Sequence, residues 1–347
     1  MDAPHLYKLP AMNRLPVEVW RRIFSFACLD DGRTGRSLSL VSKYINEASA
    51  CQRYQSVALA GESQTDRFIK QLMKHCSRER RVLYLFIRDY PRRSGPVLEY
   101  GTLCRILVLV AASLRVLSLL IIEEKREFIL SPIVLPALEE LMVHGNCEAP
   151  AVPFVVPGFE FRNLRCIHIQ GVFYKCSITS PDEFPSFDLA SGRNVVRSIT
   201  SSSPHLTHIS LSTNLAIEWR EVLQELEGSD SDPDSTLYRY GLSPNVQRIL
   251  VRPLVSHGLG DSLEYRAYRT TLAFLSHTAV RDNKARIIIQ EEAPIHDLVK
   301  NPEEPQRLWL RHIQGEESYW MEAGIPALNR NAAGRAILRD ALNAPSG

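Results

Sequence analysis

The chain has 347 residues, of which 45% are hydrophobic and 23% charged, as in a folded globular protein with room for two domains. The net charge of +2 gives no electrostatic reason to expect binding to nucleic acid or to an acidic membrane. The seven cysteines include no Cys-x-x-Cys pair, which argues against a disulfide framework or a zinc site. No charged-then-apolar leader and no Asn-x-Ser/Thr sequon occurs, so we expect a cytoplasmic or nuclear protein, or one found in both.

The first predicted element is a short helix that begins at Leu15-Pro16. Proline suits the first turn of a helix, and Glu18 lies where the helix dipole favours a carboxylate. Apolar residues then recur at helical spacing, at Val19, Trp20, Ile23, Phe24 and Ala27. This apolar face is wider than a two-turn core contact requires, so we expect the helix to dock on something else.

Three blocks in this part of the chain carry a resemblance to a known family. The pattern Leu-Pro-x-Glu-x-x-x-x-Ile-Phe in residues 15–24 is followed by Leu-Val-Ser-Lys at 40–43 and by Tyr-Gln-Ser-Val-Ala-Leu at 54–59. In this order the blocks resemble an F-box, most closely that of the large fungal families in which an F-box opens a leucine-rich-repeat-like chain. The resemblance implies a three-helix module, residues 10–60, that binds a Skp-type adaptor and through it a cullin.

The resemblance also implies which residues contact the adaptor: Leu15, Pro16, Val19, Trp20, Ile23, Phe24, Leu40 and Val41. The chain departs from the family at Trp20, where an aliphatic residue is usual, and at Ile45, where many members have tryptophan. Trp20 either enlarges the adaptor contact or packs inward against Tyr44. The alternative interpretation of residues 15–50 is an amphipathic helical cap on the domain that follows.

A six-residue signature, Leu-x-x-Leu-x-Leu with aliphatic substitutions, recurs along the next part of the chain. Its six copies begin at residues 82, 114, 138, 164, 206 and 246. The shortest intervals, 114 to 138 and 138 to 164, match the length of leucine-rich repeats, and the longer ones indicate insertions. Each copy predicts a strand, and helices are expected at 65–75, 216–226 and 262–279.

The predicted fold class is therefore α/β, with the three-helix F-box module followed by an irregular leucine-rich-repeat-like solenoid over residues 61–322. We expect one curved parallel sheet with helices and irregular coil on its convex side. The apolar run 106–122 is too short to span a membrane and divides into the end of a helix and a strand. Residues 323–347 are expected to form a C-terminal helix or tail.

Other segments break the repeat pattern. Residues 145–163 and 171–188 are rich in proline, glycine and phenylalanine and predict ordered loops, and the acidic run 227–235 predicts a mobile loop. A C-terminal segment from residue 302 carries Trp309, Ile313 and Trp320 on one helix face, which is typical of a cap on the last repeat.

Local catalytic signatures are absent from the sequence. No Gly-x-Ser-x-Gly elbow, phosphate-binding loop or His-Glu-x-x-His occurs, so we expect no catalytic residue, no cofactor and no enzyme activity. His144, His168 and His208 fall on successive predicted strands at outward positions, but they run diagonally and would not converge on one metal ion. We expect them to be solvated or to contact a partner.

The outward positions of the strands define a concave face, which is where solenoid proteins commonly bind partners. The residues that we expect to bind a target protein there are Tyr84, Phe86, Met142, His168, His208, Arg248 and Arg252. The other interpretation is a plain solvated sheet face that loops partly cover. The sequence, with its F-box resemblance, favours a substrate-recognition subunit of a Skp–cullin–F-box ubiquitin ligase. One alternative is an interaction or scaffold protein whose N-terminal helices only cap the solenoid. Another is an α/β enzyme, which would need a deep pocket.

Overall fold

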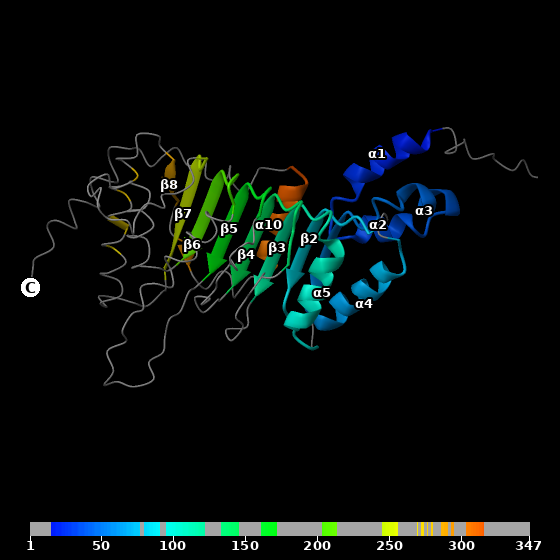
Figure 1. The fold of residues 1–347 in the computed structure, drawn as a ribbon, viewed down its shortest axis with the longest axis horizontal. Coiled ribbons are helices and arrows are strands. Elements are labelled where there is room, and N and C mark those ends of the chain that lie inside the picture. The colour runs from blue at the N-terminus through cyan, green and yellow to red at the C-terminus, as the bar shows by residue number, and fades with distance from the viewer. Residues whose placement is uncertain are drawn as a thin grey trace, which may run out of the picture.

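The computed structural model describes residues 15–76, 80–90, 95–121, 133–145, 161–171, 203–213, 245–255, 286–290, 293–294 and 303–315, and helical backbone at 269, 272, 273, 276 and 279. In this part of the chain, eight strands lie side by side in sequence order and form one open, curved, all-parallel sheet (Figure 1). The predicted α/β class and parallel sheet are therefore confirmed. The segments expected at 216–226, 227–235 and 323–347, and Trp320, lie outside the described residues.

The strands repeat one register across the sheet. They are β1 (Ser56–Ala60), β2 (Tyr84–Arg88), β3 (Val116–Ile121), β4 (Glu140–Gly145), β5 (Cys166–Gly171), β6 (His208–Thr213), β7 (Arg248–Val255) and β8 (Ile287–Ile289), and the two-residue β9 (Ala293–Pro294) pairs with the end of β7. The six signature copies became β2 to β7, with their central aliphatic residues aligned from Leu85 to Ile249. β1 and β8 flank them. β1 carries the spacing Tyr54-x-x-Val57-x-Leu59, the same signature with an aromatic first residue.

The main hydrophobic core lies on one face of the sheet, which two helices cover next to β1–β3. Alternate strand residues point into it, because successive side chains of a strand point to opposite faces. From α4 (Gly61–Met73), Ile69 and Leu72 are fully buried in this core, whereas Met73 at the end of the helix is 59% exposed. The apolar run 106–122 divides as expected, into the end of α5 (Tyr100–Val110) and β3.

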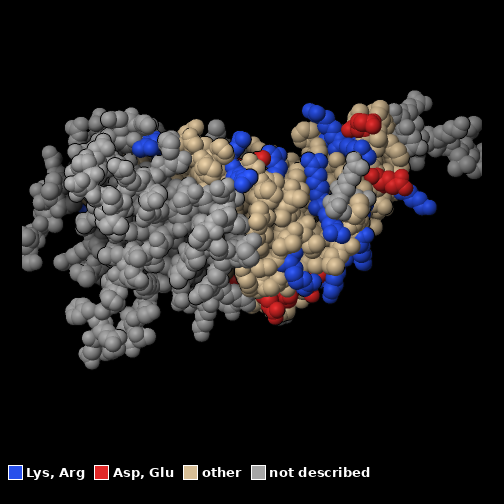
Figure 2. Space-filling view, in the orientation of Figure 1, with Lys and Arg blue, Asp and Glu red and all other residues tan. Residues whose placement is uncertain are grey.

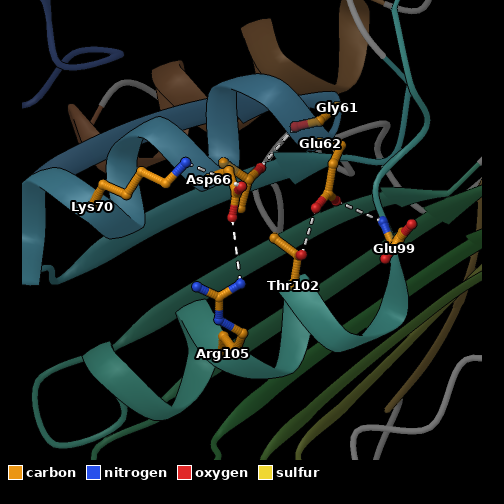
Figure 3. Close-up of polar contacts among 8 residues, drawn as sticks. Gly61, Glu62, Asp66, Lys70, Glu99, Thr102 and Arg105 are labelled. Atoms are coloured by element: carbon orange, nitrogen blue, oxygen red, sulfur yellow. Dashed lines mark hydrogen bonds and ion pairs between the residues drawn. The ribbon is translucent and has the colours of Figure 1, made fainter.

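Polar contacts hold α4 against α5 (Figure 3). A carboxylate oxygen of Glu62 accepts a hydrogen bond from the Glu99 N–H at 2.8 Å, and the other accepts one from the Thr102 hydroxyl at 2.5 Å. Glu99 is the residue before the first turn of α5, and its own side chain makes no capping bond. Glu62 thus satisfies a backbone donor at the start of a neighbouring helix. Arg105 and Asp66 form a further ion pair at 3.4 Å.

Three short helices precede the sheet: α1 (Val17–Ala27), α2 (Arg33–Leu38) and α3 (Lys43–Ser49). They share a small core of Phe24, Cys28, Ile45 and Ala48. Ser42 caps α3 by accepting the Ile45 N–H at 3.2 Å. The helices are tied to the sheet at β1, where the Ser56 hydroxyl donates to the Asp30 carbonyl at 2.5 Å. Within the described residues, no helix has the length and hydropathy needed to cross a bilayer.

The helix α10 (Glu304–Ile313) lies on the opposite face of the sheet from α4 and α5 (Figure 1). Pro305 occupies its first turn, and Trp309 and Ile313 are buried on its inner side. The prediction that Trp309 and Ile313 share one helix face is confirmed. α10 contacts β2 and packs on the side chains of β2–β4, so it covers the N-terminal part of the concave face and does not cap the last strand.

Candidate functional site

The first candidate surface is apolar and lies on the N-terminal helices. We call it the N-terminal apolar surface; its exposed side chains are Leu15, Pro16, Val19, Ile23, Phe26, Leu40, Val41 and Tyr44. Leu40 is 82% exposed, Phe26 65% and Val41 62%. The Tyr44 hydroxyl donates to the Leu15 carbonyl at 3.2 Å, which brings the start of α3 beside the start of α1. Leu15 belongs to the first sequence block from which an adaptor contact was predicted, and Tyr44 directly follows the second.

Two of the predicted adaptor-contacting residues point inward. Phe24 is 3% exposed and belongs to the core of the three helices, so a direct contact between Phe24 and an adaptor is ruled out in this conformation. Trp20 is half-buried and stacks on Phe24, with ring centroids 5.4 Å apart. Trp20 therefore packs inward as one of the two alternatives expected, although its ring partner is Phe24 and the expected partner was Tyr44.

Sequence reasoning missed Phe26 and Tyr44, both of which are exposed on this surface. A signal for Phe26 was present, because residues 19, 23 and 26 follow the i, i+4, i+7 spacing of one helix face. Lys, Arg, Asp and Glu side chains are interspersed around these helices on the face shown in Figure 2. No single sign of charge dominates there, so apolar contact is the main feature of this surface.

The second candidate surface is the concave face, part of which α10 covers. Trp309 is fully buried, and its ring centroid lies 5.6 Å from that of Phe86. Val116, Leu120 and Met142 complete the apolar cluster beneath it. The expectation that this part of the concave face is exposed is wrong, because the apolar side of α10 covers it.

Three of the predicted target-binding residues are inaccessible in this conformation: Phe86 and Met142 are each 1% exposed, and His168 on β5 is 2% exposed. Tyr84, His208, Arg248 and Arg252 remain half-buried. Tyr84 on β2 and the arginines on β7 lie five strands apart, roughly 24 Å at ordinary strand spacing, so the seven predicted residues do not form one contact site.

Polar contacts fix both ends of α10. At its start, the Arg88 guanidinium donates from Nη1 to the Glu303 carboxylate at 3.0 Å. Near its end, His312 Nε2 lies 2.5 Å from a Glu140 carboxylate oxygen. Just beyond the helix, the Gln314 side-chain amide donates to the Leu29 carbonyl at 2.9 Å, which links α10 to the segment between α1 and α2.

Two of the three histidines on the concave face are buried, which corrects the expectation that they are solvated or contact a partner, and His208 is half-buried. His144 and His168 are 0% and 2% exposed, and their ring centroids lie 5.3 Å apart. His144 Nδ1 donates to the Gln170 side-chain oxygen at 3.0 Å, and His168 Nδ1 hydrogen-bonds Ser210 Oγ at 2.8 Å. The diagonal arrangement is confirmed by the register, which places His168 opposite Met142 and Ser210.

Burial also determines the charge of these side chains. Desolvation lowers the pKa of His144 to about 4, against the Gln170 hydrogen bond, which raises it. Desolvation lowers the pKa of His168 well below its usual value, and the nearby His144 lowers it further. Both imidazoles are therefore neutral at pH 7. The described residues contain no group of three His, Cys, Asp or Glu side chains that could hold a metal ion.

A pocket of about 190 Å³ lies between α2, β1 and α10, where Arg33, Arg36 and Gln306 line it. It is smaller than the roughly 300–1,000 Å³ typical of small-molecule sites. Arg33 is paired with Asp31 at 3.0 Å. This pocket thus offers less for recognition than the two surfaces described above.

Comparison of the chain with known protein families and with curated protein sequences finds no match. The structure alone therefore defines the class of the protein. The described residues form an α/β protein with a solenoid-like parallel sheet, an exposed apolar surface on its N-terminal helices, and a helix docked on its concave face.

Proposed function

We propose that this protein is the substrate-recognition subunit of a Skp–cullin–F-box ubiquitin ligase. In this proposal the N-terminal helices are an F-box that binds a Skp-type adaptor, and the sheet domain, an irregular leucine-rich-repeat-like solenoid, holds a target protein. No covalent chemistry is assigned to the chain, because the ubiquitin transfer belongs to other subunits.

The observation that carries the proposal is the N-terminal apolar surface. Six residues that the F-box resemblance assigns to adaptor contact are exposed on it: Leu15, Pro16, Val19, Ile23, Leu40 and Val41. Contiguous exposed apolar surface marks interaction sites, because water disfavours it in a protein that stays alone. The helices bury Phe24 and Ile45 in their own core, so the exposed set is left over for a partner.

The experiment is a binding titration of a purified Skp-type adaptor with the full chain and with the double variant Ile23→Asp, Leu40→Asp. Each aspartate would place a charge in an apolar contact, and we expect the affinity to fall by at least about 100-fold, roughly 2.7 kcal/mol. The matched control is Val108→Asp on α5, where the native valine is 64% exposed and lies outside this surface. Equal binding by the double variant and the unaltered chain would contradict the proposal.

The alternative function is an interaction or scaffold protein in which these helices serve only as a cap for the sheet. The contacts with β1 favour it: the Gln55 side-chain amide donates to the Ser25 carbonyl at 2.8 Å, and Ser56 donates to Asp30. A cap explains those contacts but leaves Leu40 and Val41 exposed without a role. A chain that binds no adaptor yet unfolds when residues 15–50 are removed would support the cap.

A further inference from the structure

The docking of α10 on the concave face resembles the binding of a separate ligand. We call the residues beneath the helix the α10 seat: Phe86, Arg88, Val116, Leu120, Glu140 and Met142. The indole of Trp309 fills the centre of this seat, with Ile313 beside it, and Glu303 and His312 contact charged side chains at the two ends. An amphipathic helix with apolar anchors on a protein surface is one of the common modes of peptide recognition.

In the described part of the chain, several buried polar groups beneath α10 lack hydrogen-bond partners. Arg88 is 1% exposed, yet its carboxylate partner Glu303 has a side chain that is 59% exposed. Within the described residues, Arg88 Nε and Nη2, Trp309 Nε1 and Ser118 Oγ are buried without a hydrogen-bond partner. Ser118 lies between Phe86 and Met142 in the same row of the sheet. Buried polar groups that lack partners cost free energy, so α10 satisfies its seat incompletely.

The core on the other face of the sheet differs in this respect. Its members are apolar side chains such as Leu85, Leu117 and Leu141, each at most 1% exposed. The α10 seat and the adjacent Ser118 instead place a buried cation, a buried hydroxyl and a carboxylate around an apolar centre, which is a combination typical of a binding site.

The helix itself is short. α10 has ten residues, and an isolated helix of that length is marginal in water, so its helical state depends on the seat. The chain before it, residues 295–302, lies outside the described part of the structure. A tethered segment competes with free ligands at an effective concentration in the millimolar range. A partner helix that satisfies the seat better than α10 can therefore displace it.

We propose that the α10 seat is a binding site for an aromatic-bearing amphipathic helix of a partner protein that begins with a carboxylate, and that α10 occupies it as an intramolecular ligand. The partner is defined by what α10 itself presents. It carries a carboxylate for Arg88, an aromatic residue six positions later for the apolar centre, and a hydrogen-bond donor three positions after that for Glu140. This inference goes beyond the adaptor contact and does not depend on it.

The first test uses a fluorescent peptide with the sequence of residues 302–316, added to the full chain and to the double variant Glu303→Gln, Trp309→Ala. The variant weakens the hold of α10 and leaves the seat residues intact. We expect it to bind the peptide at least tenfold more tightly than the unaltered chain, because the tethered competitor is removed. Equal affinity of the two chains for the peptide, or no binding to either, would overturn the proposal.

Two controls accompany this titration. A peptide with the same two substitutions is expected to bind neither chain, since the carboxylate and the indole are missing. The matched protein variant is Arg307→Ala, on the outer side of α10, where the native side chain is 67% exposed. It is expected to bind the peptide as the unaltered chain does.

A second measurement needs no variant that could unfold. In hydrogen exchange of the unaltered full chain, the amides of α10 are expected to exchange at least 100-fold faster than those of β3 and β4, because the helix leaves its seat without unfolding of the sheet. Exchange of α10 at the same rate as β3 and β4 would show that the helix is part of the permanent core, and would overturn the proposal.

Discussion

Two imidazoles, those of His144 and His168, are buried on the concave side of the sheet, where their charged forms lack water. The folded chain keeps them neutral, and the pKa of His144 lies at about 4, whereas an unfolded histidine titrates near 6.5. Between these values the unfolded chain binds a proton at this side chain that the folded chain does not bind. The stability that depends on neutral His144 is therefore fully present above pH 6.5 and is lost as the pH falls toward 4.

This difference leads to a prediction about pH. The free energy of unfolding should fall by up to about 1.4 kcal/mol per pH unit for His144 between pH 6.5 and 4, with a further loss from His168. The substitution His144→Gln should reduce that slope in urea unfolding measured at pH 7, 6 and 5. The control is His205→Gln at an exposed position. An unchanged slope in the His144 variant would show that this side chain is not buried as a neutral base.

At Gly145, the backbone conformation requires glycine. It ends β4 with φ of 142°, and a Cβ there would lie 1.6 Å from the Ile121 carbonyl oxygen on β3. Gly145→Ala should lower the free energy of unfolding by more than about 2 kcal/mol, because neither backbone can move without breaking the β3–β4 pairing.

The matched control is Gly101→Ala, in the first turn of α5, where a Cβ would meet no atom within 4 Å. Alanine should raise helix stability there by up to about 1 kcal/mol. Thermal or urea unfolding of both variants gives the comparison. Similar stability of the two variants would contradict the close approach of β3 and β4 at this point.

At the scale of elements, the junction between α4 and α5 depends on one carboxylate. Glu62 accepts hydrogen bonds from the Glu99 N–H and the Thr102 hydroxyl, so it provides α5 with the cap that its own sequence lacks (Figure 3). Glu62→Ala should lower the free energy of unfolding by about 1–2 kcal/mol, since a backbone donor and a buried hydroxyl lose their partner. Urea unfolding of this variant beside Ser63→Ala, an exposed neighbour in α4, isolates the effect.

The strands could be predicted from sequence because one residue pattern controls both their spacing and their register. The central residues Leu85, Leu117 and Leu141 align across β2, β3 and β4, and the pattern alone places them in neighbouring strands. The apolar run 106–122 could be divided between α5 and β3 from sequence, because neither the helix nor the strand accounts for the whole run. Such local signals operate within a few residues.

The position of α10 could not be predicted in this way. The spacing of Trp309 and Ile313 indicates an apolar helix face but does not say which surface receives it. The helix follows β9 in sequence and yet contacts β2, a pairing set by the complementarity of Trp309, Phe86 and Met142. For the same reason the burial of Phe86 and Met142 was missed. The burial of Phe24 was not predicted, because helix spacing alone does not show that Phe24 points inward while its neighbour Ile23 points outward.

At the scale of the whole molecule, the two surfaces that we propose for recognition lie near one end of the described chain. The N-terminal apolar surface lies on the helices before β1, and the α10 seat lies on β2–β4. The hydrogen bond from Gln314 to Leu29 joins the region of α10 to the loop after α1. In the proposed complex, an adaptor on the N-terminal helices and a target on the concave face would bind to separate surfaces.

The most direct measurement of the proposed function is hydrogen exchange of the full chain with and without a saturating amount of purified Skp-type adaptor. We expect a complex in which slowed exchange is confined to α1 and residues 38–44 and exchange in β2–β4 is unchanged. No complex, or protection that falls on the sheet while α1 and residues 38–44 are unaffected, would contradict the assignment of the N-terminal helices as an adaptor-binding F-box.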